Sequence, residues 1–199
     1  GRWSQAEEAS RQAATARPGS PRHVTLHALM RHRTGDSAAG LTLLDSIPSG
    51  ETHPSVRVIR ARILQDSGSD PARALDEATA VVDDLAERAT PFELAWAHLL
   101  RAKHAAAQGD ASTALQEVRA AATHPPPSDE AFAMGMIETF LRAGSATEAR
   151  EHLSALPEPP IDESGRALLT AEVLLDAGAL DEALEALGAA EATPRRSLL

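Results

Sequence analysis

The eight histidines are the first residues of this sequence whose chemistry could serve a site. His23 and His27 lie four residues apart in a stretch of helical periodicity, which places them on one helix face, as a pair of metal ligands requires. Their stretch holds no carboxylate to complete a metal shell, and Arg22, Arg31 and Arg33 would repel a cation. We interpret it as a basic, solvated helix face, with a metal site as the alternative, and expect no bound metal.

No other set of side chains points to catalysis. The chain has no cysteine, which excludes thiolate nucleophiles, thiolate zinc sites and iron–sulfur clusters. It also lacks the Gly-x-Ser-x-Gly turn of serine hydrolases and the phosphate-binding patterns GxxxxGKS/T and GxGxxG. Carboxylate pairs such as Asp129-Glu130 open predicted helices, where the helix dipole favours negative charge. We therefore expect no catalytic residues, no enzymatic activity and no cofactor.

The charge is distributed unevenly along the chain. Residues 1–108 carry 13 Lys+Arg and 13 Asp+Glu, whereas residues 109–199 carry 6 and 16, so the net charge of −10 falls in the C-terminal part. Contacts with nucleic-acid phosphates need clustered cations, and we expect no direct nucleic-acid binding. No apolar run approaches the roughly 20 residues that cross a bilayer. We expect a cytoplasmic protein without membrane contact.

Helical periodicity runs through most of the chain. Apolar residues recur every three or four positions, in stretches rich in Ala, Leu, Glu and Arg that glycine and proline separate. The alternation typical of strands is missing, so we predict an all-α fold made of helix pairs. The expected first helices of the pairs are 22–34, 54–67, 91–108, 128–143 and 162–177, and the expected second helices are 2–16, 36–47, 71–88, 110–123, 145–155 and 179–191.

A repeat accounts for this pairing. The glycines expected to turn from first to second helices are separated by 34, 33, 41, 35 and 34 residues. Glycine ends a helix at low cost because it accepts the left-handed conformation. A small residue follows five positions later in most units, or six in one, and would let the two backbones approach closely. These glycines are Gly1, Gly35, Gly68, Gly109, Gly144 and Gly178, and the small residues are Ala6, Gly40, Ala74, Ala114, Ala149 and Ala183.

With these features the whole chain resembles tetratricopeptide repeat (TPR) proteins. The resemblance implies one domain, an α-α superhelix of about five and a half hairpins: a half unit at 1–18 and units at approximately 21–50, 53–90, 91–126, 128–160 and 162–194. The family's usual aromatic early in the first helix is missing. The 41-residue unit implies either a second helix extended to about Arg88 or a longer loop before Pro91. HEAT-type repeats of ~40–47 residues are the competing assignment, which four of the five spacings disfavour.

The resemblance also implies a binding surface. In TPR arrays the first helices line a concave face that takes up peptides or helices, so we expect a non-catalytic scaffold for a protein or peptide partner. The mapped face is basic at its N-terminal end and acidic at its C-terminal end, which predicts that an acidic ligand docks near residues 22–62. Reversing the charges of Arg33, Arg62 and Lys103 together should abolish binding without unfolding. The mapped residues are Thr25, Leu29, His32, Arg33, Val58, Arg62, Gln65, Trp96, Leu99, Lys103, Met134, Glu138, Leu168 and Glu172.

Two alternatives to this function stay open. The mapped residues could be solvated side chains on an unused face. The chain could also be the regulatory region of a multidomain bacterial transcriptional regulator or signalling ATPase. The first unit lacks its leading helix, which favours upstream domains in a longer protein.

Overall fold

The computed structural model describes residues 2–48, 52–124, 129–155, 170–171, 173–175, 178 and 182–186, and these contain helices and no strand. The all-α prediction is confirmed for them, with most helix ends within two residues of those expected. The expected helices 162–177 and 179–191 lie largely outside the described residues. The helices are α1 (Arg2–Ala16), α2 (Pro21–Arg33), α3 (Ser37–Asp45), α4 (Pro54–Asp66), α5 (Pro71–Asp83), α6 (Pro91–Ala107), α7 (Ala111–Ala122), α8 (Glu130–Arg142) and α9 (Ala146–Ser154).

Local sequence signals set where these helices begin and end. Asp36, Asp70 and Asp110 cap α3, α5 and α7, each accepting a backbone N–H three residues ahead at 3.0 Å. Proline opens α2, α4, α5 and α6, where its missing N–H costs nothing. The turn glycines Gly35, Gly68, Gly109, Gly144 and Gly178 all adopt positive φ, between 64° and 96°. These five glycines therefore have the backbone conformation that the repeat predicted.

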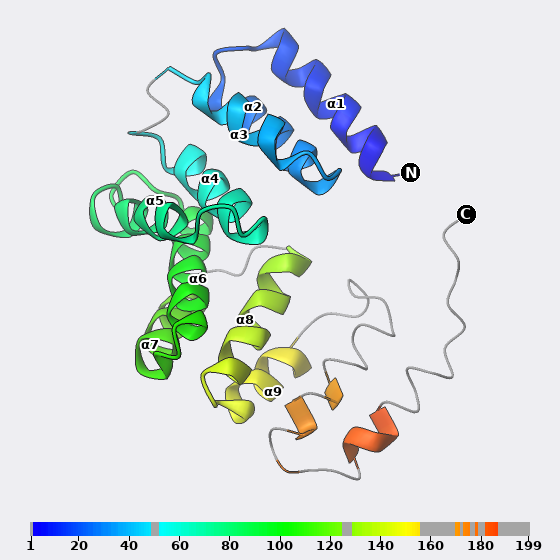
Figure 1. Cartoon of the computed structure of the whole chain (residues 1–199), viewed down its shortest axis with the longest axis vertical. Helices are drawn as coiled ribbons and strands as arrows, with labels where there is room; N and C mark the ends of the chain where they lie inside the picture. Colours follow the sequence, from blue (N-terminus) through cyan, green and yellow to red (C-terminus); the bar gives the residue numbers. More distant parts are fainter. Residues whose placement is uncertain are drawn as a thin grey trace.

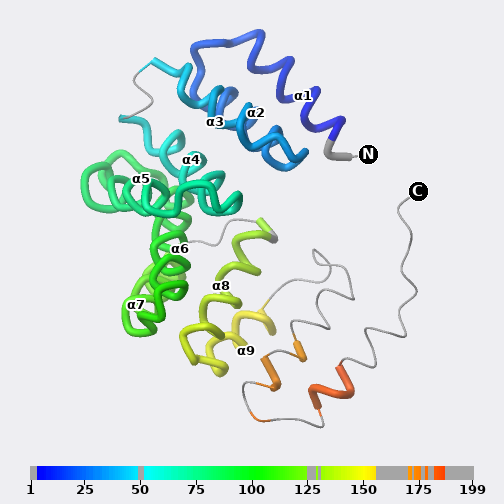
Figure 2. The backbone as a smooth tube through the Cα atoms, in the orientation of Figure 1, coloured from blue at the N-terminus to red at the C-terminus, as the bar shows by residue number. Residues whose placement is uncertain are grey.

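The helices form a chain of antiparallel neighbours. We call α2, α4, α6 and α8 the first helices and α3, α5, α7 and α9 the second helices; each first helix packs on the second helix that follows it. Each of α4, α6 and α8 also packs on the first helix before it and on the preceding second helix, and α1 packs on α2 as a preceding second helix would. Figure 1 shows the resulting arc, with α4 and α8 on its inner side and α5 and α7 on its outer side. Figure 2 follows the same path as a tube.

Small residues bring the two helices of a hairpin together. A Cβ added to Gly40 would lie 2.8 Å from the backbone oxygen of Ala28, so only glycine fits there. The equivalent residues Ala74, Ala114 and Ala149 are at most 1% exposed. The predicted role of this small position is confirmed in the hairpins that the structure describes.

The 41-residue unit is built differently from both expectations. The second helix α5 ends at Asp83 rather than near Arg88, and the linker 84–90 is no longer than the linker 46–53. Instead α5 has 13 residues where α3 has 9, and α6 has 17 where α4 has 13. The unit thus gains about one helical turn in each of two helices that pack on each other.

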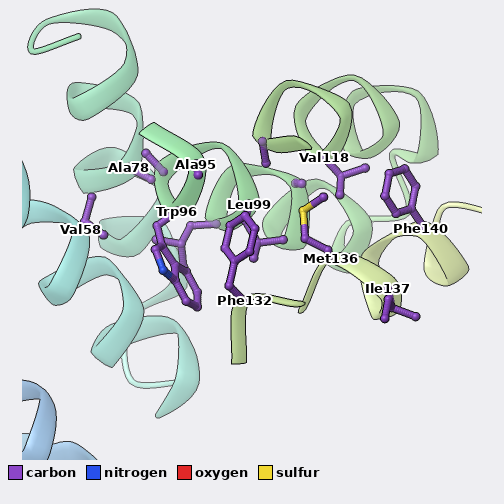
Figure 3. Packing of buried hydrophobic residues seen from close by; sticks show 14 of the residues in the cluster. Val58, Ala78, Ala95, Trp96, Leu99, Val118, Phe132, Met136, Ile137 and Phe140 are labelled. Atoms are coloured by element: carbon purple, nitrogen blue, oxygen red, sulfur yellow. The ribbon is translucent and has the colours of Figure 1, made fainter. Parts of the chain in front are cut away.

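The largest apolar cluster extends over α4 to α9. Figure 3 shows Trp96 of α6 between Val58 of α4 and Phe132 of α8. The rings of Trp96 and Phe132 meet edge to face, with centroids 5.2 Å apart. Phe140 is 1% exposed, as expected for a core aromatic. Of the helices described, none combines the length and apolar character needed to cross a membrane.

Candidate binding face on the first helices

The first helices are the elements that position the predicted site. Because α2, α4, α6 and α8 pack side by side, side chains from three or four of them reach one surface. We call this surface the first-helix face and define it by His32, Arg33, Asp66, Lys103 and Asp129.

Arg62 lies beneath this face rather than on it. Its guanidinium carbon lies 3.6 Å from the centre of the Trp96 ring, and its Nη2 is 3.4 Å from a carboxylate oxygen of Asp129. The side chain is 2% exposed, and neither its Nε nor the Nε1 of Trp96 has a hydrogen-bond partner. Burial lowers the pKa of Arg62 to about 10, although the negative charge of Asp129 acts to raise it. The arrangement places a desolvated cation between α4, α6 and α8.

Asp66, the last residue of α4, links the neighbouring first helices. One carboxylate oxygen is 3.5 Å from Nε2 of His32 on α2, and the other is 3.8 Å from Nζ of Lys103 on α6. Burial raises the pKa of Asp66, but the His32 hydrogen bond and the charges of Lys103 and Arg62 outweigh burial and hold it below its usual range. The Asp66 side chain remains 35% exposed, so one carboxylate at the surface faces several cations.

The predicted site residues occupy three kinds of position. Thr25, Val58 and Leu99, each ten residues before a turn glycine, are at most 5% exposed and pack in the interior. Arg62 and Trp96, at 2% and 4%, are also buried, so these five residues do not form the open surface that the mapping expected. The residues that do reach the surface, fully or in part, are Leu29, His32, Arg33, Gln65, Lys103, Met134 and Glu138. Leu168 and Glu172 lie outside the described residues.

The burial of Arg62 corrects one expectation about charge reversal. A glutamate at position 62 would place a carboxylate beneath Trp96 and opposite Asp129, where neither hydration nor a cation offsets it. We therefore expect that substitution to unfold the protein. Arg33 and Lys103 remain as surface cations, and Arg33 forms no ion pair with another described residue.

The histidine pair of α2 is not a solvated face. His27 is 9% exposed, and its Nε2 has no hydrogen-bond partner. Burial lowers the pKa of His27, which keeps the ring neutral, while Glu7 opposes that shift. His23 instead contacts the hydroxyl of Ser20, at 2.8 Å. In the described part of the chain no three histidine or carboxylate side chains gather as a metal site.

Two ion-pair networks, centred on the nearly buried Glu77 and Glu117, were missed by the sequence analysis. Arg60 of α4 contacts Glu77 of α5 at 3.0 Å and Asp45 of α3 at 3.2 Å. Arg101 of α6 contacts Glu117 of α7 at 2.7 Å and Asp83 of α5 at 3.2 Å. Each network joins a first helix to the second helices before and after it.

A repeated sequence signal could have revealed these networks. Each arginine directly precedes a buried alanine seven residues before the turn glycine, Ala61 or Ala102. Each glutamate follows the small residue of its second helix, Ala74 or Ala114, by three positions. The pattern pairs positions that face each other across a hairpin.

Comparison with known proteins adds no relative: no family model, no curated protein and no solved structure matches the chain.

Proposed function

We propose that this chain is a TPR-type helical-repeat scaffold whose first-helix face binds a peptide or protein partner. The observation that carries the proposal is the side-by-side packing of α2, α4, α6 and α8, which makes one continuous surface from four segments of the chain. Stacked helical pairs use such extended surfaces for binding, so the step from this architecture to a binding function is an argument by fold analogy.

The charges on the face support a partner with negative charge. Arg33 is exposed and lacks an ion pair among the described residues, and Lys103 has only a long contact of 3.8 Å to Asp66. Cations of this kind steer an oppositely charged segment to the surface and speed its association. The acidic C-terminal part of the chain would repel the same segment, which directs it toward α2, α4 and α6.

The test uses peptides selected against the chain from a random displayed library. The variant R33E/K103E reverses two surface charges and should lower the affinity of the selected peptides about tenfold. The matched control R119E/R150E makes the same change in net charge on the second helices α7 and α9, where both arginines are about half exposed. We expect the control to change affinity less than twofold, and both variants to remain folded by circular dichroism.

An equal loss of affinity in both variants would mean that only net charge matters. Unchanged affinity in R33E/K103E would place the binding surface elsewhere. Either result contradicts the proposal.

A further inference from the structure

The basic side chains around Asp66 are arranged as an anion site that Asp66 itself fills. His32 on α2, Lys103 on α6 and the buried Arg62 on α4 all act on this one carboxylate. These three side chains come from three different helices, so their convergence on Asp66 is more than an ion pair within a single helix. Arg33 adds a further positive charge close enough to Arg62 to depress the pKa of Arg62.

The contacts that hold Asp66 are long. Its oxygens lie 3.5 and 3.8 Å from the nitrogens of His32 and Lys103, whereas charge-assisted hydrogen bonds have lengths of about 2.7–2.9 Å. The paired carboxylates of the second helices do reach such distances, for example 2.7 Å between Arg101 and Glu117. Asp66 is also partly exposed, so its side chain can rotate away without opening the core.

A second observation is that buried hydrogen-bond donors lack an acceptor where α4, α6 and α8 meet. The Nε of Arg62 and the Nε1 of Trp96 are buried donors without a hydrogen-bond partner, just below the charged surface. Buried donors of this kind are uncommon, and each calls for an explanation such as a missing acceptor. The junction of α4, α6 and α8 therefore holds two buried donors that no acceptor among the described residues satisfies.

We infer that Asp66 is a built-in competitor: a carboxylate of an acidic partner peptide binds to His32, Lys103 and Arg33 by displacing Asp66 from His32 and Lys103. This inference rests on the proposed binding function and names the chemistry of its ligand, an acidic peptide segment. It predicts that removing the charge of Asp66, a residue of the binding face, strengthens peptide binding rather than weakening it. Asp66 then makes binding depend on the number of carboxylates in the peptide. A segment with a single carboxylate gains little binding free energy when it replaces Asp66, and a segment with several carboxylates gains more.

The experiment measures binding of a hexaglutamate peptide by the whole chain at low salt. The variant D66N should bind it roughly five- to tenfold more tightly than the wild-type chain. The control D83N makes the same change in net charge at the end of α5, on an aspartate that is 56% exposed and pairs with Arg101. D83N should differ from wild type by less than twofold. Raising the salt concentration should abolish the gain of D66N, because exposed charges are screened.

Three results bear on the inference separately from the proposed function. If D66N binds hexaglutamate no more tightly than D83N, the competitor role is overturned, while selected library peptides could still bind the first-helix face. If D66N gains affinity but R33E/K103E does not weaken the library peptides, the anion site stands and the proposed function fails. For the wild-type chain, hexaglutamate should shift the NMR signals of the His32 ring and leave those of His98 unchanged. This last measurement tests the site even if D66N does not fold.

Discussion

The first-helix face and the contacts between first and second helices use charge in different ways. Across the first-helix face, the carboxylate of Asp66 lies 3.5 Å from the His32 imidazole and 3.8 Å from the Lys103 ammonium. Around the second helices, Glu77 and Glu117 are nearly buried, and each accepts from two basic side chains at 2.7 to 3.0 Å. Buried, hydrogen-bonded pairs hold helices in place, whereas long pairs at a surface contribute little to stability. The close pairs therefore account for stability, and the long surface pairs are the ones available for the proposed binding.

The largest expected effect comes from breaking a second-helix network. Glu77→Ala leaves Arg60, whose side chain is 3% exposed, without its closest carboxylate. Removing one partner of a buried pair costs about 3 kcal/mol or more in free energy of unfolding. Urea denaturation should show this loss. Arg73→Ala, at a side chain that is 48% exposed, serves as the control and should change the free energy by less than about 0.5 kcal/mol. A loss for Glu77→Ala as small as that of the control would remove the distinction between the two sets.

A pH dependence separates a buried histidine from the surface pairs. The pKa of His27 is lowered by burial in the folded state, so the unfolded chain binds the proton more readily. Stability should therefore fall as the pH drops through about 6.5, the unfolded value, toward 5. The variant H27Q should flatten this part of the curve of free energy against pH. H23Q, at the partly exposed histidine one turn earlier, should leave the slope unchanged; an equal change in both variants would contradict the assignment to His27.

The smallest effect is expected for the exposed pair between α7 and α9. Arg119 donates from Nε and Nη2 to the two carboxylate oxygens of Glu148, each at 2.8 Å. These hydrogen bonds lower the pKa of Glu148 to about 2. A lowered carboxylate pKa stabilises the fold above the unfolded value of 4.5, and that contribution disappears as the pH falls toward 2. Because Arg119 is 57% exposed, solvent screening limits the effect to about 0.5 kcal/mol. Glu148→Gln should be less stable than wild type at pH 7, and the difference should shrink as the pH falls from 4.5 through 2; a difference that does not shrink would point to lost packing instead.

The sequence predicted the helices better than it predicted the face. Turn glycines and proline starts are local signals, and they located the described helices within a few residues, apart from the C-terminal end of α5. The rotation of each helix about its axis is not a local property, because it depends on how neighbouring first helices pack. For that reason Val58 and Leu99, mapped to the open face, turn out to be buried, while Lys103 reaches the surface. The cation–π contact of Arg62 with Trp96 joins two helices and carries no signal in either segment.

The central claim is that the first-helix face, and not the surface of the second helices, contacts the partner. Mapping of backbone amide chemical shifts, with an acidic peptide selected from the displayed library, tests this claim residue by residue. The account predicts that the shifted amides cluster in α2, α4 and α6 around His32, Asp66 and Lys103. Shifts concentrated in α3, α5 and α7 would contradict it.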